Sequence, residues 1–334
     1  MNILVTGSNG FVGSRLMYEL ENKKHSVVGI DISDKCDSKK HPMTIIGDIR
    51  IESDIIRAVI RHKELTNSDV EVIIHCAAAK HDFGISETEY YSHNETGTKI
   101  ITQFAEKYGI KKILYFSTVS VYGHPPIRAN EDEEYNPDNP YGASKLAGEL
   151  ICKEWQQKDV NNELVVLRPT VIYGPYNYAN MYKLIDMMHR HPYITIGNGN
   201  HIKSIVSLDN LVNITLFCLD KMRKGMIDYN CVDKPYMKLR ELMELIAKNR
   251  EFRIPLIRVP LSTALLLGKL FDVFAIVLKK DIPVNSDRLK KLSTATDFSS
   301  DKLTAEGYIQ EYSTENCLNS FLSWYLDVNK VKTT

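Results

Sequence analysis

Short apolar runs alternate with longer amphipathic segments through the first half of the chain. The runs with the length and β-branched composition of buried strands are 3–5, 26–31, 44–46, 70–75, 112–117 and 164–168. The segments that carry apolar residues at helical spacing are 13–21, 51–62, 94–108 and 141–157. Strands that alternate with helices in this way predict an α/β fold, a doubly wound parallel sheet built from βαβ units.

The pattern loosens after about residue 175, where proline and glycine interrupt the sequence more often. We therefore expect a first domain at 1–175 and a smaller C-terminal lobe at 176–330 that mainly contacts the substrate. The runs at 205–208 and 226–232 have the composition of strands, and we expect them to return to the main sheet.

The charge balance excludes one class of partner. Lys and Arg together number 42 and Asp and Glu also number 42, so the formal net charge is zero. A dedicated nucleic-acid-binding protein would carry a basic excess, so we expect no nucleic acid as a partner. Six cysteines occur without a C-x-x-C pair, which indicates reduced thiols and neither a zinc site nor a disulfide framework.

The start of the chain and one long apolar segment decide the expected location. No basic and apolar leader precedes the first strand pattern, so we expect a cytoplasmic protein. The segment 261–278 is apolar on most faces, but Lys269 and Asp272 leave uncharged runs too short to span a membrane. Because Lys279 and Lys280 follow it, the segment fits both a buried helix and a helix lying at a membrane surface.

A glycine-rich turn follows the first predicted strand and opens the first predicted helix. Gly7 permits the tight turn, Gly10 lets a pyrophosphate approach the backbone at the helix N-terminus, and Gly13 lets helix and strand pack closely. Asp31 ends the second strand, where a carboxylate binds an adenosine ribose diol and repels a 2′-phosphate. These residues predict an NAD site, with further contacts from the loop residues Asn9, Phe11 and Val12.

A second constellation follows the later strands. Tyr141 and Lys145 are four residues apart, which places them on one face of a predicted helix. A nearby ammonium favours the phenolate, so the pKa of Tyr141 falls toward working pH and the residue can act as general base or acid. Thr118 follows the strand at 112–117 and can hold the same substrate oxygen by a hydrogen bond. We therefore assign Thr118, Tyr141 and Lys145 as catalytic residues.

Together these residues resemble an extended short-chain dehydrogenase/reductase of the sugar-nucleotide epimerase and dehydratase family. Further stretches that match this pattern, over nearly the whole chain, are 47–50, 75–78, 94–98, 117–123 and 168–175. The resemblance implies a Rossmann fold, no metal, and an NAD that Tyr141 and Lys145 also hold. The other cofactor contacts that it implies are Asp48, Ile49, Ala77, Ala78, Lys80 and Asn94. It also implies a homodimer formed through the helices at Asn94 and Tyr141.

Departures from the family pattern narrow the reaction. The dehydratases of this family follow their catalytic Thr with Asp-Glu, whereas Val119 and Ser120 stand here, which disfavours dehydration. The UDP-glucose 4-epimerases usually carry an Asn where this chain has Val171, so their hexose contacts are not transferred to it.

The same resemblance assigns three residues of the second lobe, in addition to Thr118, to the substrate. Lys203 stands where the family more often has Arg, and its ammonium can still meet a phosphate as a point charge. Thr296 lies where strict UDP-glucose enzymes have a bulky Tyr, which leaves room for an N-acetyl group. Arg288 matches the diphosphate-binding arginine, whose guanidinium fork suits two phosphate oxygens.

Within the family, the stretches at 168–174, 229–235 and 294–298 resemble most the bacterial 4-epimerases that act on N-acetylglucosamine carried on undecaprenyl diphosphate. This implies an NAD-dependent 4-epimerase that interconverts N-acetylglucosamine and N-acetylgalactosamine on undecaprenyl diphosphate or UDP through a transient 4-keto sugar. It also implies a role in polysaccharide biosynthesis, such as that of O-antigen, and a peripheral contact of 261–278 with the inner face of the membrane.

Three alternatives stay open. A UDP-glucose/galactose 4-epimerase would use the same three catalytic residues. A ketosugar reductase or a hydroxysteroid-type oxidoreductase would also use them but would exchange NAD(P)(H) in each cycle, whereas a 4-epimerase retains its cofactor. A non-catalytic dinucleotide-sensing protein is disfavoured by the intact Thr118, Tyr141 and Lys145.

Overall fold

The computed structural model describes most of the chain and divides it into two compact units. The described residues are 1–36, 38–80, 84–190, 194–196, 198–249, 251–255, 257–259, 263 and 295–331. The first unit consists of Met1–Ile172, Val206–Val232 and Phe298–Tyr312, and the second of Tyr173–Ile205, Asp233–Asp297 and Ser313–Thr334. The segment 261–278, apart from residue 263, and Arg288 lie outside the described residues.

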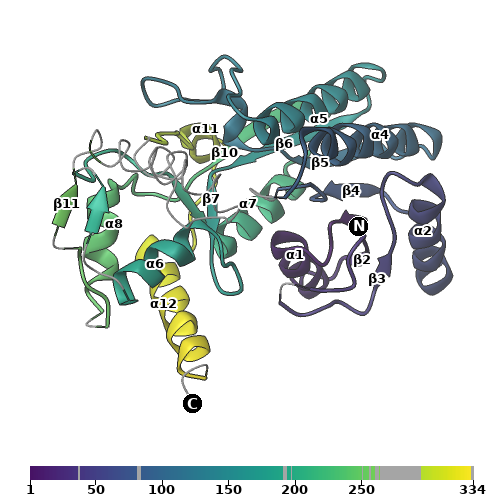
Figure 1. Cartoon of the computed structure of the whole chain (residues 1–334). Coiled ribbons are helices and arrows are strands. Elements are labelled where there is room, and N and C mark those ends of the chain that lie inside the picture. The colour runs from purple at the N-terminus through teal and green to yellow at the C-terminus, as the bar shows by residue number, and fades with distance from the viewer. Residues whose placement is uncertain are drawn as a thin grey trace. The chain divides into compact units, whose positions relative to one another are not determined.

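Within the described residues, the first unit is built on a seven-stranded sheet in the order β10-β6-β5-β4-β1-β2-β3 (Figure 1). Its strands are β1 (Asn2–Thr6), β2 (Ser26–Asp31), β3 (Thr44–Ile46), β4 (Val72–His75), β5 (Lys112–Phe116), β6 (Glu163–Pro169) and β10 (Gly225–Cys231). Every neighbouring pair is parallel. The strand order changes direction at β1, since β2 and β3 lie on one side of it and β4, β5 and β6 on the other. The sheet is therefore the doubly wound sheet that the sequence predicts, with its ligand crevice expected at the carboxyl end of β1.

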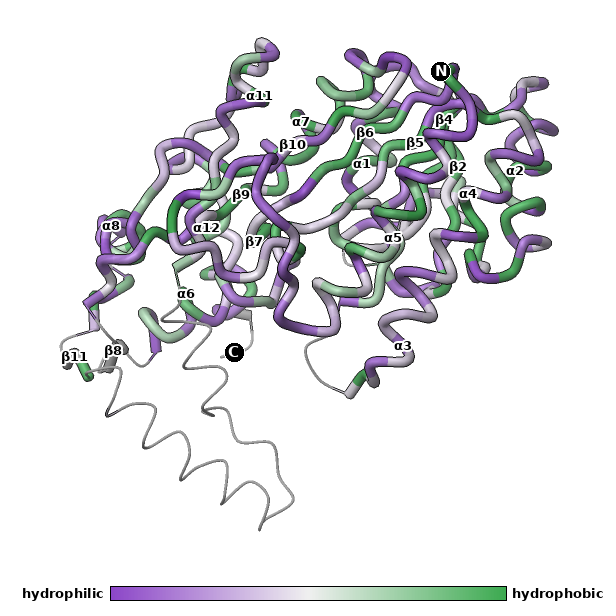
Figure 2. The backbone as a smooth tube through the Cα atoms, turned by 90° about the horizontal axis from the view of Figure 1, so that it is seen from above, coloured by the Kyte–Doolittle hydropathy of each residue, from purple (hydrophilic) through white to green (hydrophobic). Residues whose placement is uncertain are grey.

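Successive residues of each strand pack into different cores, because strand side chains alternate between the two faces of a sheet. On one face, Ile3 and Val5 of β1 pack with α1 (Phe11–Asn22) and α7 (Leu208–Asp220). On the other face, Leu4 packs with α2 (Glu52–Thr66), α4 (Gly97–Lys107) and α5 (Pro140–Gln157). The central strands are therefore hydrophobic on both faces, and they appear green in Figure 2, whereas the covering helices alternate in colour.

The predicted helices form where the periodicity places them. The segments at 13–21, 51–62 and 141–157 correspond to α1, α2 and α5. The start of α5 has two local causes: the Asn139 side chain accepts a hydrogen bond from Gly142 N at 2.9 Å, and Pro140 occupies the first turn. The predicted helix at 94–108 is interrupted, because the π-helical turn η1 (Ser92–Thr96) precedes α4 and the short helix α3 (Glu87–Tyr91) precedes η1.

One strand prediction for the second half of the chain is correct and the other is wrong. The run at 226–232 forms β10, which joins the main sheet beside β6. The run at 205–208 forms β9 (Ile205–Ser207), but β9 pairs with β7 (Val171–Tyr173) in a separate two-stranded sheet and does not return to the main sheet. The partner of β9 is therefore β7, whereas β10 pairs with β6 along the full length of both strands.

The described elements of the second unit are α6 (Asn180–Arg190), β8 (Ile194–Ile196), α8 (Leu239–Ile246), β11 (Ile257–Val259) and α12 (Thr314–Val331). β8 and β11 pair in parallel. Helices α6 and α12 are joined by Tyr325, whose ring centre lies 5.2 Å from that of Tyr182 and whose hydroxyl donates to Asp186 at 2.7 Å. In the part of the chain that the structure describes, no helix is long and apolar enough to cross a membrane.

Candidate active site

The glycine-rich turn between β1 and α1 has a geometry that requires its glycines. Gly7 has a φ of +69°, and a Cβ there would lie 2.7 Å from the nitrogen of Ala77, just beyond β4. A Cβ at Gly13 would lie 2.1 Å from the Gly7 carbonyl oxygen, so only glycine lets α1 pack this closely on the turn. Gly10 caps α1 without a side-chain hydrogen bond, which leaves the first amide groups of the helix for an anion.

The carboxylate of Asp31 at the end of β2 is joined to this turn. One oxygen accepts a hydrogen bond from Asn9 N at 2.9 Å and the other from Ser33 N at 2.9 Å. Each oxygen has further lone pairs, so both can still accept a ribose hydroxyl. Asn9 Oδ1 is buried and has no hydrogen-bond partner among the described residues. Together with the amide groups of Phe11 and Val12 at the start of α1, these atoms fit the pyrophosphate and adenosine ribose of NAD.

The turn predicted to contact adenine contains a closed ion pair. Arg50 donates to the two carboxylate oxygens of Asp48 at 2.5, 2.9 and 3.0 Å, and also to Ser92 Oγ of η1 at 2.9 Å. Burial would raise the pKa of Asp48, but the hydrogen bonds and charge of Arg50 outweigh it and lower the pKa. The neighbouring Ile49 is buried in the core below α4. The ion pair therefore fixes the conformation of this turn, and the Asp48 carboxylate can still accept a hydrogen bond from the amino group of an adenine.

Asn94 fixes the loop that follows β4. Its Oδ1 accepts from Ala79 N at 2.8 Å, and its Nδ2 donates to Ala79 O at 3.1 Å and to Ser144 Oγ of α5 at 2.9 Å. The side chain of Asn94 thus supports residues 77–78, which are predicted to line the cofactor, and ties their loop to α5. Lys80 at the end of the loop is exposed, with its ammonium 5.9 Å from the centre of the aromatic ring that begins α1.

Sequence reasoning missed a buried hydrogen-bond chain behind this loop. His75 Nδ1 lies 2.7 Å from Thr6 Oγ1, and His75 Nε2 lies 3.0 Å from Thr98 Oγ1. Burial, aided by the charge of Lys145, lowers the pKa of His75 to about 3, so the imidazole stays neutral. A neutral ring has one donor and one acceptor nitrogen, so His75 joins β1 to α4 through the two hydroxyl groups. The available signal was a histidine at the end of an otherwise apolar strand.

Tyr141 and Lys145 lie one turn apart on α5, as their spacing predicts. Lys145 is 2% exposed, and its ammonium lies 4.2 Å from the centre of the Tyr115 ring. Burial lowers the pKa of Lys145 to about 8, so the group is charged at neutral pH but close to its titration. The ring of Tyr141 lies 6.1 Å from that of Tyr90 in α3. An ammonium one turn from a phenol can favour the phenolate and so suits acid–base chemistry.

Thr118 caps the short 3₁₀ helix η2 (Val119–Tyr122), which follows β5. Its hydroxyl accepts a hydrogen bond from Ser120 N at 3.2 Å and donates to Ser120 Oγ at 3.3 Å. A Cβ at Gly142 would lie 2.6 Å from Ser120 O, so η2 and the first turn of α5 are in direct backbone contact. The structure therefore places the three residues assigned as catalytic on two adjoining segments.

Two of the three substrate residues assigned in the second unit are neighbours. Lys203 and Thr296 form a parallel β-bridge, and Ser204 N donates to Thr296 O at 2.8 Å. Burial lowers the pKa of Lys203 to about 8. Thr296 Oγ1 is buried and has no hydrogen-bond partner within the described ranges. These two side chains suit a polar ligand, whereas Arg288 lies outside the described residues.

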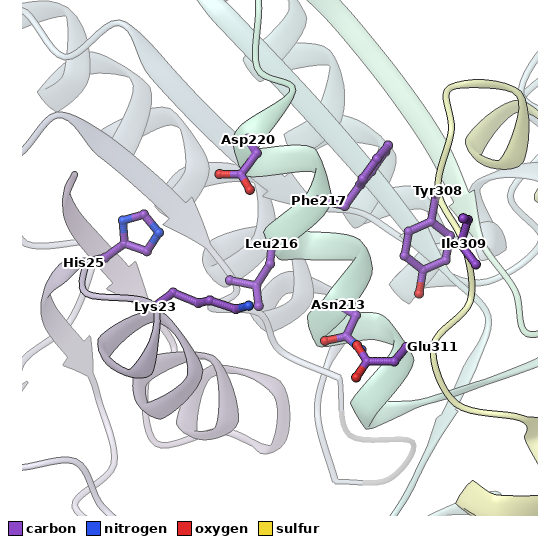
Figure 3. A pocket seen from close by; sticks show the side chains of 9 residues that line it. All are labelled: Lys23, His25, Asn213, Leu216, Phe217, Asp220, Tyr308, Ile309 and Glu311. Carbon is purple, nitrogen blue, oxygen red and sulfur yellow. The ribbon is translucent and has the colours of Figure 1, made fainter.

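A separate cleft of about 450 Å³ in the first unit is shown in Figure 3. Lys23 and His25 line it from the connection between α1 and β2, and Asn213 of α7 donates to Glu311 across it at 2.8 Å. His25 precedes the amino end of β2, whereas the glycine-rich turn follows the carboxyl end of β1. The cleft is therefore not part of the candidate site.

Known proteins resemble the chain along most of its length. The family described as NAD dependent epimerase/dehydratase matches residues 3–231. The N-acetyl-alpha-D-glucosaminyl-diphospho-ditrans,octacis-undecaprenol 4-epimerase of Escherichia coli O157:H7 is 30% identical over 328 residues, which cover 97% of this chain and 95% of that protein. A UDP-glucose 4-epimerase of Vibrio cholerae is 27% identical over 327 residues, covering 92% of this chain and 96% of that protein.

A solved structure shares the fold. The UDP-glucuronic acid 4-epimerase from Bacillus cereus in complex with NAD has a TM-score of 0.74 and 22% identity, covering 98% of this chain and 99% of that chain. At this identity the likeness concerns the fold alone, and membership rests on the family match and on the relative from Escherichia coli. The chain belongs to the NAD dependent epimerase/dehydratase family, whose cofactor is NAD.

Proposed function

We propose that this protein is a 4-epimerase of a diphosphate-linked N-acetylhexosamine, which interconverts N-acetylglucosamine and N-acetylgalactosamine through a transient 4-keto sugar. The observation that carries the proposal is the buried Lys145 one helical turn from Tyr141, in a helix whose first turn touches the turn capped by Thr118. Epimerisation needs one group that removes a hydroxyl proton and later returns it, and it needs no second acid–base pair.

The three residues have different tasks. Tyr141, as phenolate, removes the proton from the sugar 4-hydroxyl and returns it later in the same turnover. Lys145 keeps Tyr141 ionised through its charge and holds the nicotinamide ribose. The Thr118 hydroxyl turns from Ser120 Oγ to donate its hydrogen bond to the reacting oxygen. Bound NAD would supply a reversible hydride acceptor for C4, and epimerisation would require the 4-keto sugar to turn in the site so that the hydride returns to its opposite face.

The residues after Thr118 favour epimerisation over dehydration. Elimination of water needs an acid for the leaving hydroxyl and a base for the C–H proton. The dehydratases of the family place Asp-Glu directly after the catalytic Thr, but Val119 here is buried and apolar. Ser120 binds the Thr118 hydroxyl and has no titratable group near neutral pH. Neither residue supplies the second acid–base function.

The second unit supports an acetamido sugar on a diphosphate. Thr296 is small, and its buried Oγ1, which has no partner among the residues that the structure describes, can bind the carbonyl oxygen or the N–H of an acetamido group. Lys203, bridged to it through the backbone, has a pKa of about 8 and is charged at neutral pH, so it can bind a phosphate oxygen.

The carrier that we propose is undecaprenyl diphosphate. The relative from Escherichia coli, which matches 97% of this chain, is named for N-acetylglucosamine on that carrier. A lipid-linked substrate places the reaction at the inner face of the cytoplasmic membrane, and we propose that 261–278 makes the peripheral contact. The product would serve polysaccharide biosynthesis such as that of O-antigen.

We also propose a homodimer through the helices of Asn94 and Tyr141, where Leu150 of α5 is 44% exposed.

The proposal is tested by parallel incubation of the purified protein with three substrates and no added cofactor, followed by separation of the 4-epimers. Conversion of N-acetylglucosaminyl-diphospho-undecaprenol alone supports the lipid carrier. Conversion of UDP-N-acetylglucosamine supports the acetamido pocket and replaces the carrier with UDP, and conversion of UDP-glucose alone contradicts the acetamido assignment. Conversion of none contradicts a 4-epimerase and favours an oxidoreductase that takes up cofactor in each cycle.

The role of Tyr141 has a matched control in the same unit. Tyr141→Phe is expected to lower kcat by about 10²–10⁴-fold, because the acid–base group is removed. Tyr229→Phe removes a buried phenol hydroxyl that has no hydrogen-bond partner among the described residues, and we expect kcat to stay at the wild-type value. Full kcat in Tyr141→Phe would show that another group moves the proton.

A further inference from the structure

Arg168 is a guanidinium in the interior of the first unit. It lies on β6 and is 0% exposed. Its Nε donates to Glu149 Oε2 at 3.1 Å and its Nη2 to Glu149 Oε1 at 2.7 Å, which fixes the plane of the guanidinium against α5. Its Nη1 pairs with Asp228 Oδ2 of β10 at 2.9 Å. The charge is therefore fully compensated by two carboxylates.

Two tyrosine hydroxyls complete the surroundings of this guanidinium. Arg168 Nη1 donates to Tyr122 Oη at 2.6 Å, and Nη2 donates to Tyr135 Oη at 2.7 Å. Tyr122 Oη donates in turn to Asn230 Oδ1 of β10 at 3.1 Å, and Tyr135 Oη donates to Glu149 Oε1 at 2.8 Å. One side chain of β6 thus joins β10, η2 and α5 through directed hydrogen bonds.

The connections from Arg168 end on the two segments that carry the proposed catalytic residues. Glu149 lies two helical turns beyond Tyr141 on α5, on the same face of the helix. Tyr122 is the last residue of η2, and Thr118 is the cap of that four-residue helix. A shift of either segment at its contact with Arg168 therefore moves a reacting side chain.

Close backbone contacts prevent α5 from moving closer to its neighbours. A Cβ at Gly142 would lie 2.6 Å from Ser120 O, and a Cβ at Gly148 would lie 2.6 Å from Asn94 O. Helix α5 therefore already rests against the backbone of η2 and η1 and cannot move closer to them. The bonds of Arg168 oppose movement away from η2.

We infer that Arg168 is a positioning residue, which sets the separation between the Thr118 hydroxyl and the Tyr141 phenol by holding η2 and α5 at once. The inference rests on the proposed function for the roles of Thr118 and Tyr141 and deepens it. Reacting groups have to be placed within about 0.5 Å, and a misplacement of about 1 Å can cost roughly 10²-fold in rate. The planar fork of a guanidinium fixes the direction of each bond, which a single ammonium does not.

Tyr122→Phe tests the inference without leaving a buried charge unpaired. The substitution removes the hydroxyl that Arg168 holds, while the ring keeps its contacts with Tyr135 and Phe298. We expect kcat to fall by about 10- to 100-fold with KM and the amount of bound NAD unchanged. The matched control is Tyr229→Phe, for which we expect wild-type kcat.

The opposite outcome distinguishes positioning from stability. If Tyr122 were purely structural, its substitution would reduce the folded, NAD-loaded fraction while each loaded molecule kept the wild-type kcat, and that result would overturn the inference. Arg168→Lys is the second variant, because it keeps the charge and loses the fork. Wild-type kcat in folded, NAD-loaded Arg168→Lys would equally show that the fork sets no distance.

Crystal structures of the wild type and of Tyr122→Phe with NAD test the geometry without any substrate. We expect the distance between Thr118 Oγ1 and Tyr141 Oη to differ between them by more than about 0.5 Å. An unchanged distance overturns the inference, whatever the activity of the wild type. A changed distance in a protein that epimerises no sugar upholds the positioning by Arg168 and contradicts the proposed function alone.

Discussion

Two neighbouring turns of α5 each carry a buried charge, but the surroundings of the two charges differ. Lys145 is 2% exposed and Glu149 is 0% exposed, so both are withdrawn from water. In the described part of the chain Lys145 forms no ion pair, and its ammonium lies 4.2 Å from the centre of the Tyr115 ring. Glu149, in contrast, pairs with Arg168 at 2.7 Å and with Lys153 at 3.1 Å.

The pKa values of the two groups follow from these surroundings. Burial lowers the pKa of Lys145 to about 8. Burial would raise the pKa of Glu149, but the hydrogen bonds and charge of Arg168 outweigh it and hold that pKa well below its ordinary value. One group is therefore close to titration at neutral pH, and the other keeps a fixed charge.

This difference indicates that Lys145 serves the reaction and that Glu149 serves the structure around it. A buried ammonium without a carboxylate is destabilising, and such groups persist where their charge serves a reaction. A carboxylate held by two cations cannot change its state within the working range of pH, so it can only fix geometry. We therefore expect loss of the partner of Glu149 to lower the unfolding free energy and loss of the Lys145 ammonium to raise it.

The largest effect on stability is expected from removing Arg168, the main partner of the buried Glu149. Arg168→Met leaves Glu149 buried without its main partner, and it also removes one cation from Asp228. Because a buried carboxylate that keeps only the partly exposed Lys153 as a partner is costly, the free energy of unfolding is expected to fall by about 3–5 kcal/mol. Urea unfolding at pH 7 measures this change.

The control is an exposed ion pair in the same unit. Arg61 of α2 pairs with Glu64 at 3.6 Å, and both side chains are more than half exposed. Arg61→Met is expected to leave the unfolding free energy unchanged within error, because solvent screens such pairs. Equal losses in the two variants would contradict the importance that we give to buried pairing.

The second prediction is that removing the proposed catalytic ammonium stabilises the NAD-free protein. A pKa lowered from 10.5 to about 8 corresponds to roughly 3 kcal/mol of burial cost, and the lost contact with the Tyr115 ring offsets about 1–2 kcal/mol of it. Lys145→Met is therefore expected to raise the unfolding free energy by roughly 1–2 kcal/mol at pH 7, while epimerisation is lost. Urea unfolding and the epimer assay measure the two effects.

The dependence of this gain on pH is a sharper test. Below about pH 8 both the folded and the unfolded chain hold the Lys145 proton, so the burial cost is fully present. As the pH rises from about 8 to 10.5 the folded protein loses the proton first, and the cost disappears. The stability advantage of Lys145→Met over the wild type should therefore shrink across this range. A constant advantage would mean that Lys145 does not titrate there.

The sequence predicted the architecture because the signal is local. The apolar run at 164–168 and the amphipathic segment at 141–157 match β6 and α5 to within one residue at each end. The pairing of β9 was predicted wrongly, because its partner β7 lies far away in the sequence. No pattern within 205–208 carries that information.

The same distinction holds for the candidate site. The spacing of Tyr141 and Lys145 and the glycine turn are local patterns, and the structure shows the geometry that they imply. The surroundings of Arg168 come from elements far apart in the chain, so no spacing reveals them. The signals that could have raised the question are an arginine inside an apolar strand and Glu149 four residues after Lys145.

The smallest effect is expected from Lys153→Met, and its sign is opposite to that of Lys145→Met. Lys153 is 22% exposed, pairs with Glu149 at 3.1 Å and donates to Tyr135 Oη at 2.6 Å. Burial acts to lower its pKa, but the Tyr135 hydrogen bond and the Glu149 charge outweigh it and raise the pKa, so the contribution to stability is fully present below pH 10.5. The substitution is expected to lower the unfolding free energy by about 1 kcal/mol, because Arg168 still compensates Glu149 and solvent screens the ammonium.

This loss of stability in Lys153→Met should stay constant between about pH 8 and 10, where the gain from Lys145→Met shrinks. A loss that shrank in parallel would mean that the two lysines titrate alike, and the two turns of α5 would then not differ in the way their contacts indicate.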